Sequence, residues 1–183
     1  ELLPNAITNL WDGVKNHQLS DFVCAPFYIV CKNKSRLACQ YLDACVKNPY
    51  KGHFYGRLAP RTGALICKKK ICLSNPFDER IRRFEDLEWL FRLYKYIKVF
   101  TISKPVLKTN VDFSSTSCAR KDIKEDFLGY LDFKGKSFWE KMALYSFFLG
   151  ERDYYGEQCK KLNPWLYRRY DWLLIYKVIG WMK

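Results

Sequence analysis

The stretch from Asn75 to Val99 carries the strongest secondary-structure signal in the chain. Asn75 can cap a helix with its side chain, and Pro76 suits the first helical position because a proline there loses no hydrogen bond. Beyond the first turn, apolar residues recur at helical spacing and charged residues occupy the opposite side. The pattern predicts a long amphipathic helix that covers a hydrophobic core. Its inward positions are Leu87, Leu90, Phe91, Tyr94 and Ile97.

The segments before this helix predict a mixed fold. A continuous β-prone run, Phe27–Cys31, suits a buried strand. Ser35 can cap a helix, which the dipeptide Asn48-Pro49 should end. The chain has 183 residues, enough for one hydrophobic core and short for two. We therefore expect an α+β fold, in one helix-rich globular domain over residues 1–183, with a small antiparallel sheet built around a basic hairpin.

That hairpin is predicted between Lys51 and Phe77, a stretch of 27 residues without a carboxylate. A β-prone run over residues 53–58 is followed by a turn that contains Pro60 and Gly63, and a second apolar run begins at Ala64. The stretch contains six cations, and such a scaffold would present them to a polyanion. They are Lys51, Arg57, Arg61, Lys68, Lys69 and Lys70.

The positive charge of the whole chain is concentrated in the same region. The formal net charge is +13 at pH 7, and residues 51–110 hold fourteen basic and five acidic side chains. Arg80, Arg82 and Arg83 follow the predicted hairpin and could extend its cationic surface. Such a field attracts nucleic acid or another polyanionic surface. A generally basic, soluble surface is the alternative, and the sequence alone does not separate the two.

Aromatic residues interleaved with these cations favour nucleic acid as the partner. Tyr55 lies between Lys51 and Arg57, and an exposed ring can stack on an unpaired base while neighbouring cations hold phosphates. We therefore expect a non-catalytic nucleic-acid-binding protein, with RNA the favoured ligand. It would be a ribonucleoprotein subunit or a viral or organellar accessory factor, and an intracellular location is favoured over secretion.

Catalytic chemistry has little support in the sequence. The chain has two histidines, His17 and His53, and neither lies in a motif of the secreted ribonucleases. No nucleotide-binding, serine hydrolase or zinc protease motif is present. The sequence favours a binding protein over an enzyme, and we predict no cofactor and no metal site.

The apolar end of the chain supports a second hypothesis. The last predicted helix is apolar nearly all round, so it is expected to be buried in its own domain or in a partner. The protein would then be a structural subunit of a larger protein or membrane-associated assembly. No stretch is long enough to span a bilayer. The predicted docking residues are Trp172, Ile175, Ile179 and Trp181.

The eight cysteines leave a third hypothesis open, a secreted disulfide-bonded effector or a metal-free ribonuclease. None of the cysteines forms a C-x-x-C motif, so neither a zinc ribbon nor a thioredoxin-like redox site is predicted. Buried free thiols are the default expectation for a chain with a sizeable core.

Overall fold

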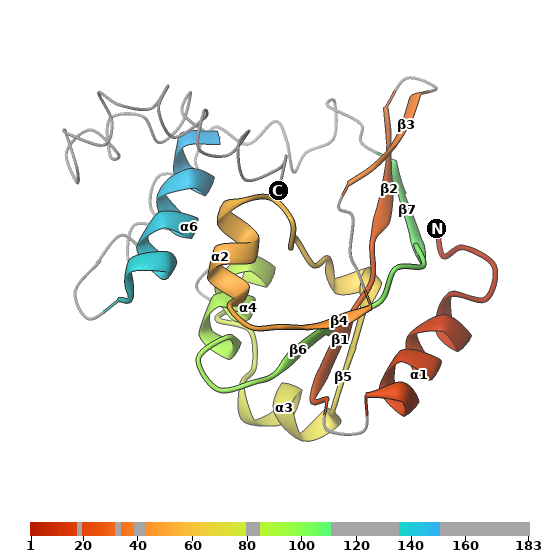
Figure 1. Cartoon of the computed structure of the whole chain (residues 1–183), viewed down its shortest axis with the longest axis horizontal. Coiled ribbons are helices and arrows are strands. Elements are labelled where there is room, and N and C mark those ends of the chain that lie inside the picture. The colour runs from red at the N-terminus through yellow and green to blue at the C-terminus, as the bar shows by residue number, and fades with distance from the viewer. Residues whose placement is uncertain (18–19, 32–33, 39–42, 80–84, 111–135, 151–183) are drawn as a thin grey trace.

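A computed structural model describes residues 1–17, 20–31, 34–38, 43–79, 85–110 and 136–150. These residues form an α+β fold, as the sequence predicts (Figure 1). The prediction of one domain over residues 1–183 stays a prediction. The described helices are α1 (Ala6–Asn16), α2 (Pro49–Phe54), α3 (Lys69–Ser74), α4 (Glu85–Leu93) and α6 (Phe138–Gly150), with a short 3-10 helix, η1 (Thr62–Ala64). The strands are β1 (Phe22–Cys24), β2 (Phe27–Cys31), β3 (Lys34–Leu37), β4 (Ala44–Val46), β5 (Leu65–Cys67), β6 (Val99–Thr101) and β7 (Leu107–Asn110).

The strands form two small sheets. The larger has the order β4-β6-β1-β5, in which β1 runs parallel to β6 and antiparallel to β5. The smaller has the order β3-β2-β7, and β2 runs parallel to β7 and antiparallel to β3. Both sheets are therefore mixed. The sequence predicts a purely antiparallel sheet, and this part of the prediction is wrong.

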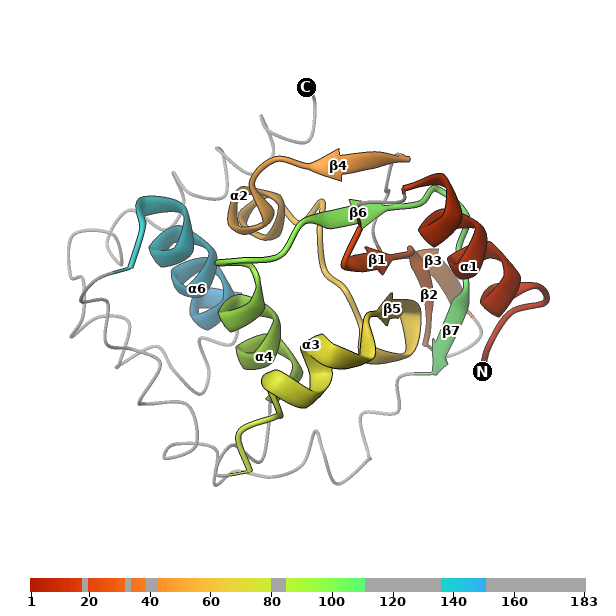
Figure 2. The same cartoon turned by 90° about the horizontal axis from the view of Figure 1, so that it is seen from below.

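Strand β1 divides the hydrophobic core into two parts. Phe22 and Cys24 pack into a cluster with α2, α4 and α6, whereas Val23 and Ala25 pack with α1. Successive side chains of a strand point to opposite faces, so one fully buried strand supplies both clusters. Figures 1 and 2 show the result: α1 covers one face of the larger sheet, and α2, α4 and α6 lie on the other.

Gly13 explains how closely α1 approaches the sheet. A Cβ atom at this position would lie 2.7 Å from Cγ2 of Ile102 and 3.1 Å from a methyl group of Val23. Glycine lowers helix propensity, but here its missing side chain lets the helix backbone lie against the strands. Gly13 therefore allows close packing of α1 against the larger sheet.

The inward face predicted for the central helix is confirmed. Leu87, Leu90 and Phe91 are buried within α4, and Tyr94 and Ile97 are buried just beyond it. The predicted start of the helix is wrong, because residues 76–79 are not helical. Asn75 instead ends α3, where its side-chain nitrogen donates to the carbonyl of Ile71.

The predicted basic hairpin is also wrong. Its first run, residues 53–58, holds the end of α2 followed by a turn, because the side chain of Asn48 accepts a hydrogen bond from the backbone nitrogen of Lys51 at 2.9 Å and Pro49 starts a helix there. Tyr50, Phe54 and Leu58 are buried at a spacing of four residues, which suits a helical start better than an alternating strand. Only β5 remains a strand, and it pairs with β1.

Helix α3 is held against α4 by polar contacts of the segment that joins them. The indole nitrogen of Trp89 donates to the carbonyl of Asn75 at 2.6 Å, and the hydroxyl of Tyr96 donates to the Asn75 side chain. Arg92 donates to the carbonyl of Pro76 at 2.8 Å. These contacts fix the position of α3 and of the three lysines at its start.

Among the described helices, none has the length and apolar character that crossing a bilayer requires.

Candidate nucleic-acid interface

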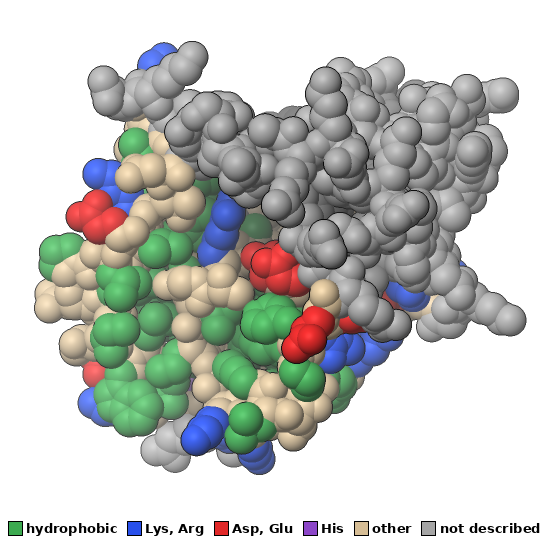
Figure 3. Space-filling model, turned by 180° about the vertical axis from the view of Figure 1, so that it is seen from behind, with side chains coloured by type: hydrophobic (Ala, Val, Ile, Leu, Met, Phe, Trp, Pro, Cys, Tyr) green, Lys and Arg blue, Asp and Glu red, His purple; other side chains and the backbone are tan. Residues whose placement is uncertain are grey.

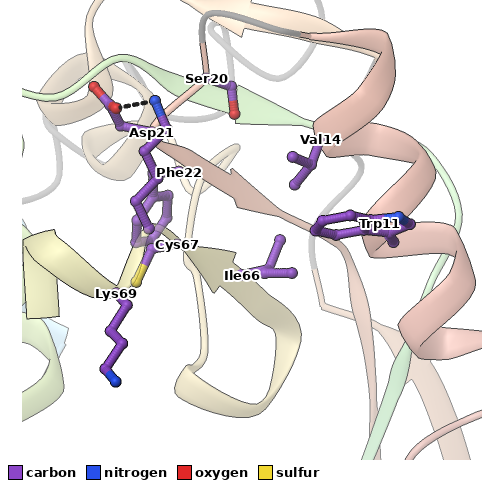
Figure 4. A pocket seen from close by; sticks show the side chains of 9 residues that line it. Trp11, Val14, Ser20, Asp21, Phe22, Ile66, Cys67 and Lys69 are labelled. Atoms are coloured by element: carbon purple, nitrogen blue, oxygen red, sulfur yellow. Dashed lines mark ion pairs between the residues drawn. The ribbon is translucent and has the colours of Figure 1, made fainter.

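A pocket of about 250 Å3 opens where α1 meets the edge of the larger sheet (Figure 4). Three segments line this pocket: α1, the start of β1, and the junction between β5 and α3. Most of its wall is apolar, so it suits a flat, weakly polar group better than a fully hydrated ion. The lining residues are Trp11, Val14, Ser20, Asp21, Phe22, Ile66, Cys67, Lys68 and Lys69.

The rim of this pocket carries a small set of polar groups. Lys68 pairs with Asp21 at 2.8 Å, and its backbone nitrogen also donates to the Asp21 carbonyl. The Ser20 hydroxyl is buried and has no hydrogen-bond partner among the described residues. A buried hydroxyl without a partner is costly, so a ligand that hydrogen-bonds Ser20 would recover free energy.

Lys69 and Lys70 supply the positive charge at this edge. Both begin α3 and are exposed, and no carboxylate of the described residues forms an ion pair with either. The nearby Asp21 is already paired with Lys68, and Asp12 on α1 pairs with Lys15 at 3.3 Å. The two lysines are therefore available to an anion.

Trp11 is the residue that sequence reasoning missed. The spacing of Leu10, Trp11 and Val14 predicts an apolar stripe that faces the core, but the Trp11 side chain is 51% exposed at the rim of the pocket. The buried positions of α1 are Ala6, Leu10 and Gly13, and Trp11 is turned about 100° away from Leu10. A sequence signal for its exposure was available, because Trp11 lies beside the narrow stripe of small and apolar residues that α1 buries.

The other predicted cations do not join this edge. Lys51 lies over the ring of Trp139 at 5.2 Å, between α2 and α6. Arg61 lies over the ring of Phe27 at 5.4 Å, beside the smaller sheet. Arg57 is exposed after α2. Figure 3 shows Lys and Arg side chains in several separate places on one face, with hydrophobic side chains between them. Of the predicted cations within the described ranges, the structure therefore brings together only Lys68, Lys69 and Lys70.

Tyr55 has neighbours that favour a structural role. Its ring packs against Phe54 at 5.0 Å and Trp139 at 6.0 Å, measured between ring centroids. The remaining predicted site residues lie outside the described part of the chain. They are Arg80, Arg82 and Arg83 of the basic region and Trp172, Ile175, Ile179 and Trp181 of the predicted docking surface.

The two histidines do not form an acid–base pair. His17 stacks near the ring of Phe100 at 4.6 Å, whereas His53 packs against Phe91 and Tyr94 in the other core cluster. Burial lowers the pKa of His53 to about 3, and its Nε2 atom is enclosed without a partner among the described residues. His53 is therefore a neutral, partly buried residue whose Nε2 side faces the core. Within the described ranges, no cluster of three or more His, Cys, Asp or Glu side chains could hold a metal ion.

No protein-family model, curated protein or solved structure matches the chain.

Proposed function

We propose that the protein binds single-stranded RNA without catalysing a reaction, through the pocket between α1 and α3. The observation that carries this proposal is the position of the exposed Trp11 indole on the same pocket as Lys69, with Lys70 next to it. An aromatic face and adjacent unpaired cations are the two elements that single-strand binding requires.

The shape of the pocket supports one nucleobase as the inserted group. Its volume of about 250 Å3 is small, and its wall is formed mainly by apolar side chains such as Val14, Phe22 and Ile66. A base in a duplex is stacked and paired, so only an unpaired base can enter such a site. The Ser20 hydroxyl lies where a polar edge of the base could use it.

The charges around the pocket support binding of the RNA backbone. Lys69 and Lys70 form no ion pair with the described residues, and Asp21 at the pocket rim and Asp12 on α1 are each paired with a different lysine. The net charge of +13 adds a long-range attraction for any polyanion. Affinity should therefore depend steeply on salt concentration.

Charge reversal at α3 is the direct test. The double variant Lys69→Glu/Lys70→Glu should bind a short fluorescent uridine oligonucleotide about tenfold or more weakly at moderate salt. The slope of log K against log salt should become shallower by about 1.4, because each phosphate of a single strand that a lysine neutralises contributes about 0.7 to the slope. Fluorescence anisotropy over a salt series measures both quantities.

A matched control changes the net charge equally at distant positions. Lys34 on β3 and Lys141 on α6 are exposed, neither lines the pocket, and Figure 1 shows β3 and α6 away from α3. The variant Lys34→Glu/Lys141→Glu should lose much less affinity. Equal loss in both variants would mean that RNA responds to total charge alone, and absence of binding by the wild-type protein would remove the proposal.

Removal of the exposed ring tests the stacking contact separately. Trp11→Ala should weaken binding of the oligonucleotide by about 5- to 150-fold, because stacking contributes roughly 1–3 kcal/mol per base. The salt dependence should stay unchanged, since no charge is altered. Trp11→Phe retains an aromatic face and should recover most of the affinity. Equal binding by the Trp11→Ala protein and the wild type would exclude the ring from the site.

A further inference from the structure

Two cysteines next to the pocket lie unusually close to each other. Cys67 ends β5, Cys72 lies in α3, and their sulfur atoms are 3.0 Å apart. Both are free thiols. The two residues differ in exposure, because Cys67 is half-buried and Cys72 is exposed. Oxidants in solution can therefore reach Cys72 first.

The local fold holds these two side chains together. The backbone nitrogen of Lys68 donates to Asp21 on the strand side, and that of Ile71 donates to the Lys68 carbonyl as α3 begins. Ile71 is buried, which fixes the rotation of the short helix and brings the next residue back toward the end of β5. A disulfide requires sulfur atoms about 2.05 Å apart, so the pair needs only about 1 Å of closure.

We propose that Cys67 and Cys72 are a thiol oxidation site that forms a reversible disulfide between β5 and α3. The oxidant is a small disulfide of the glutathione type. The Cys72 thiolate attacks one of its sulfur atoms, forms a mixed disulfide and releases one glutathione thiolate. Cys67 then loses its proton and attacks the Cys72 sulfur, which releases the second glutathione. The protein gives up two electrons and two protons, and the glutathione disulfide is reduced to two thiols.

The order of the two attacks follows from the surroundings of each sulfur. Burial, together with the neighbouring Cys72 thiol, raises the pKa of Cys67 to about 12, so this residue carries little thiolate at neutral pH. It is a poor first nucleophile and is shielded from bulky reagents. At 3.0 Å it is nevertheless well placed for the second step, which occurs within the protein.

The modification is independent of the proposed RNA binding. It requires only the two thiols and a small disulfide, and it can be measured without a nucleic acid. Cys67 also lines the pocket, so the disulfide would lie in its wall beside Lys68 and Lys69.

Mass spectrometry of the full chain tests the proposal. The protein is incubated with mixtures of reduced and oxidised glutathione, acidified, alkylated and digested with trypsin. Because Lys68, Lys69 and Lys70 separate the two cysteines, cleavage leaves them on different peptides that only a disulfide can join. The joined peptide should become the dominant product at Cys72, and dithiothreitol should remove it.

Single variants and an internal control complete the experiment. In Cys67→Ser, Cys72 should stop at the mixed disulfide with glutathione. The exposed thiol of Cys45 should also stop there in the wild-type protein, because it has no neighbouring thiol among the described residues. A stable mixed disulfide at Cys72 in the wild type, or its linkage to a different cysteine, would overturn the proposal. In protein unfolded by urea, Cys72 should no longer form its disulfide preferentially with Cys67.

Discussion

The free energy of unfolding should fall by about 2 kcal/mol when the pH is lowered from 7 to 5, because the partly buried His53 stays neutral in the folded protein. The pKa of this histidine is lowered to about 3 in the folded protein, against a usual value of 6.5. Between these two values the unfolded chain binds a proton that the folded chain does not. The contribution of His53 to the free energy of unfolding is therefore fully present above about pH 6.5 and is lost progressively as the pH falls toward 3.

The cause of the shift is the aromatic surroundings of His53. Its ring lies 5.1 Å from that of Phe91 and 5.7 Å from that of Tyr94, and its Nε2 has no partner among the described residues. Desolvation of an imidazolium in this position raises its free energy, and no hydrogen bond or carboxylate of the described residues compensates for this at Nε2. Urea unfolding at pH 7, 6 and 5 measures the loss.

Two histidine variants isolate the contribution of this residue. His53→Leu removes the titrating group and should unfold with nearly the same free energy at pH 7 and pH 5. His17→Gln, which changes the other histidine, should retain the decline of the wild type. If the free energy of unfolding fell equally with pH in His53→Leu and in the wild type, the loss would come from titratable groups other than His53.

Arg92→Ala should lower the free energy of unfolding by about 3 kcal/mol, since it removes two charge-assisted hydrogen bonds from a carboxylate that stays buried. Arg92 holds both carboxylate oxygens of Glu88 at 2.9 Å, and the Glu88 side chain is only 5% exposed. The arginine also donates to the Pro76 carbonyl, so its loss loosens the segment between α3 and α4. Chemical denaturation at pH 7 measures the change.

A surface pair provides the control for this prediction. Lys15 pairs with Asp12 on α1, but both side chains are more than half exposed, so Lys15→Ala should cost less than about 0.5 kcal/mol. The double variant Glu88→Met/Arg92→Met replaces the ion pair with apolar chains of similar length and should recover most of the loss. Equal effects of Arg92→Ala and Lys15→Ala would contradict a special role for the buried carboxylate.

The i,i+4 spacing of Glu88 and Arg92 on one predicted helix is enough to predict their ion pair, but not the burial of the carboxylate. Both residues lie on the polar side of that helix, which is normally solvated. The segment after α3 lies over this side and its carbonyl at Pro76 binds the arginine. The i,i+4 contact is local and could be predicted, whereas the covering segment is a tertiary feature.

The two Asn-Pro dipeptides show why helix boundaries were predicted incorrectly. Asn48-Pro49 was expected to end a helix and Asn75-Pro76 to begin one. In the structure Asn48 caps the start of α2, whereas Asn75 ends α3. An asparagine side chain can accept from a free backbone nitrogen or donate to a free carbonyl, so the same dipeptide suits either end. The choice depends on partners such as Trp89 and Tyr96, which lie far along the chain.

The candidate site was predictable only in part. The adjacent lysines of α3 stood out because a short run of charge stays exposed in most folds. The pocket joins Trp11 to residues 20–22 and 66–69, and no local pattern relates these segments. Likewise, the contacts of Lys51 with Trp139 and of Arg61 with Phe27 depend on the tertiary fold.

The parallel strand pairs have a consequence for the order of folding. Phe22 pairs with Val99 and Phe27 pairs with Leu107, so each sheet is completed by a segment made much later in the chain. Closing such long loops costs entropy before any pairing compensates for it, which slows folding. In a nascent chain that stops before residue 99, the central strand β1 would lack its parallel neighbour β6. Formation of the core must therefore wait until both distant strands have been synthesised.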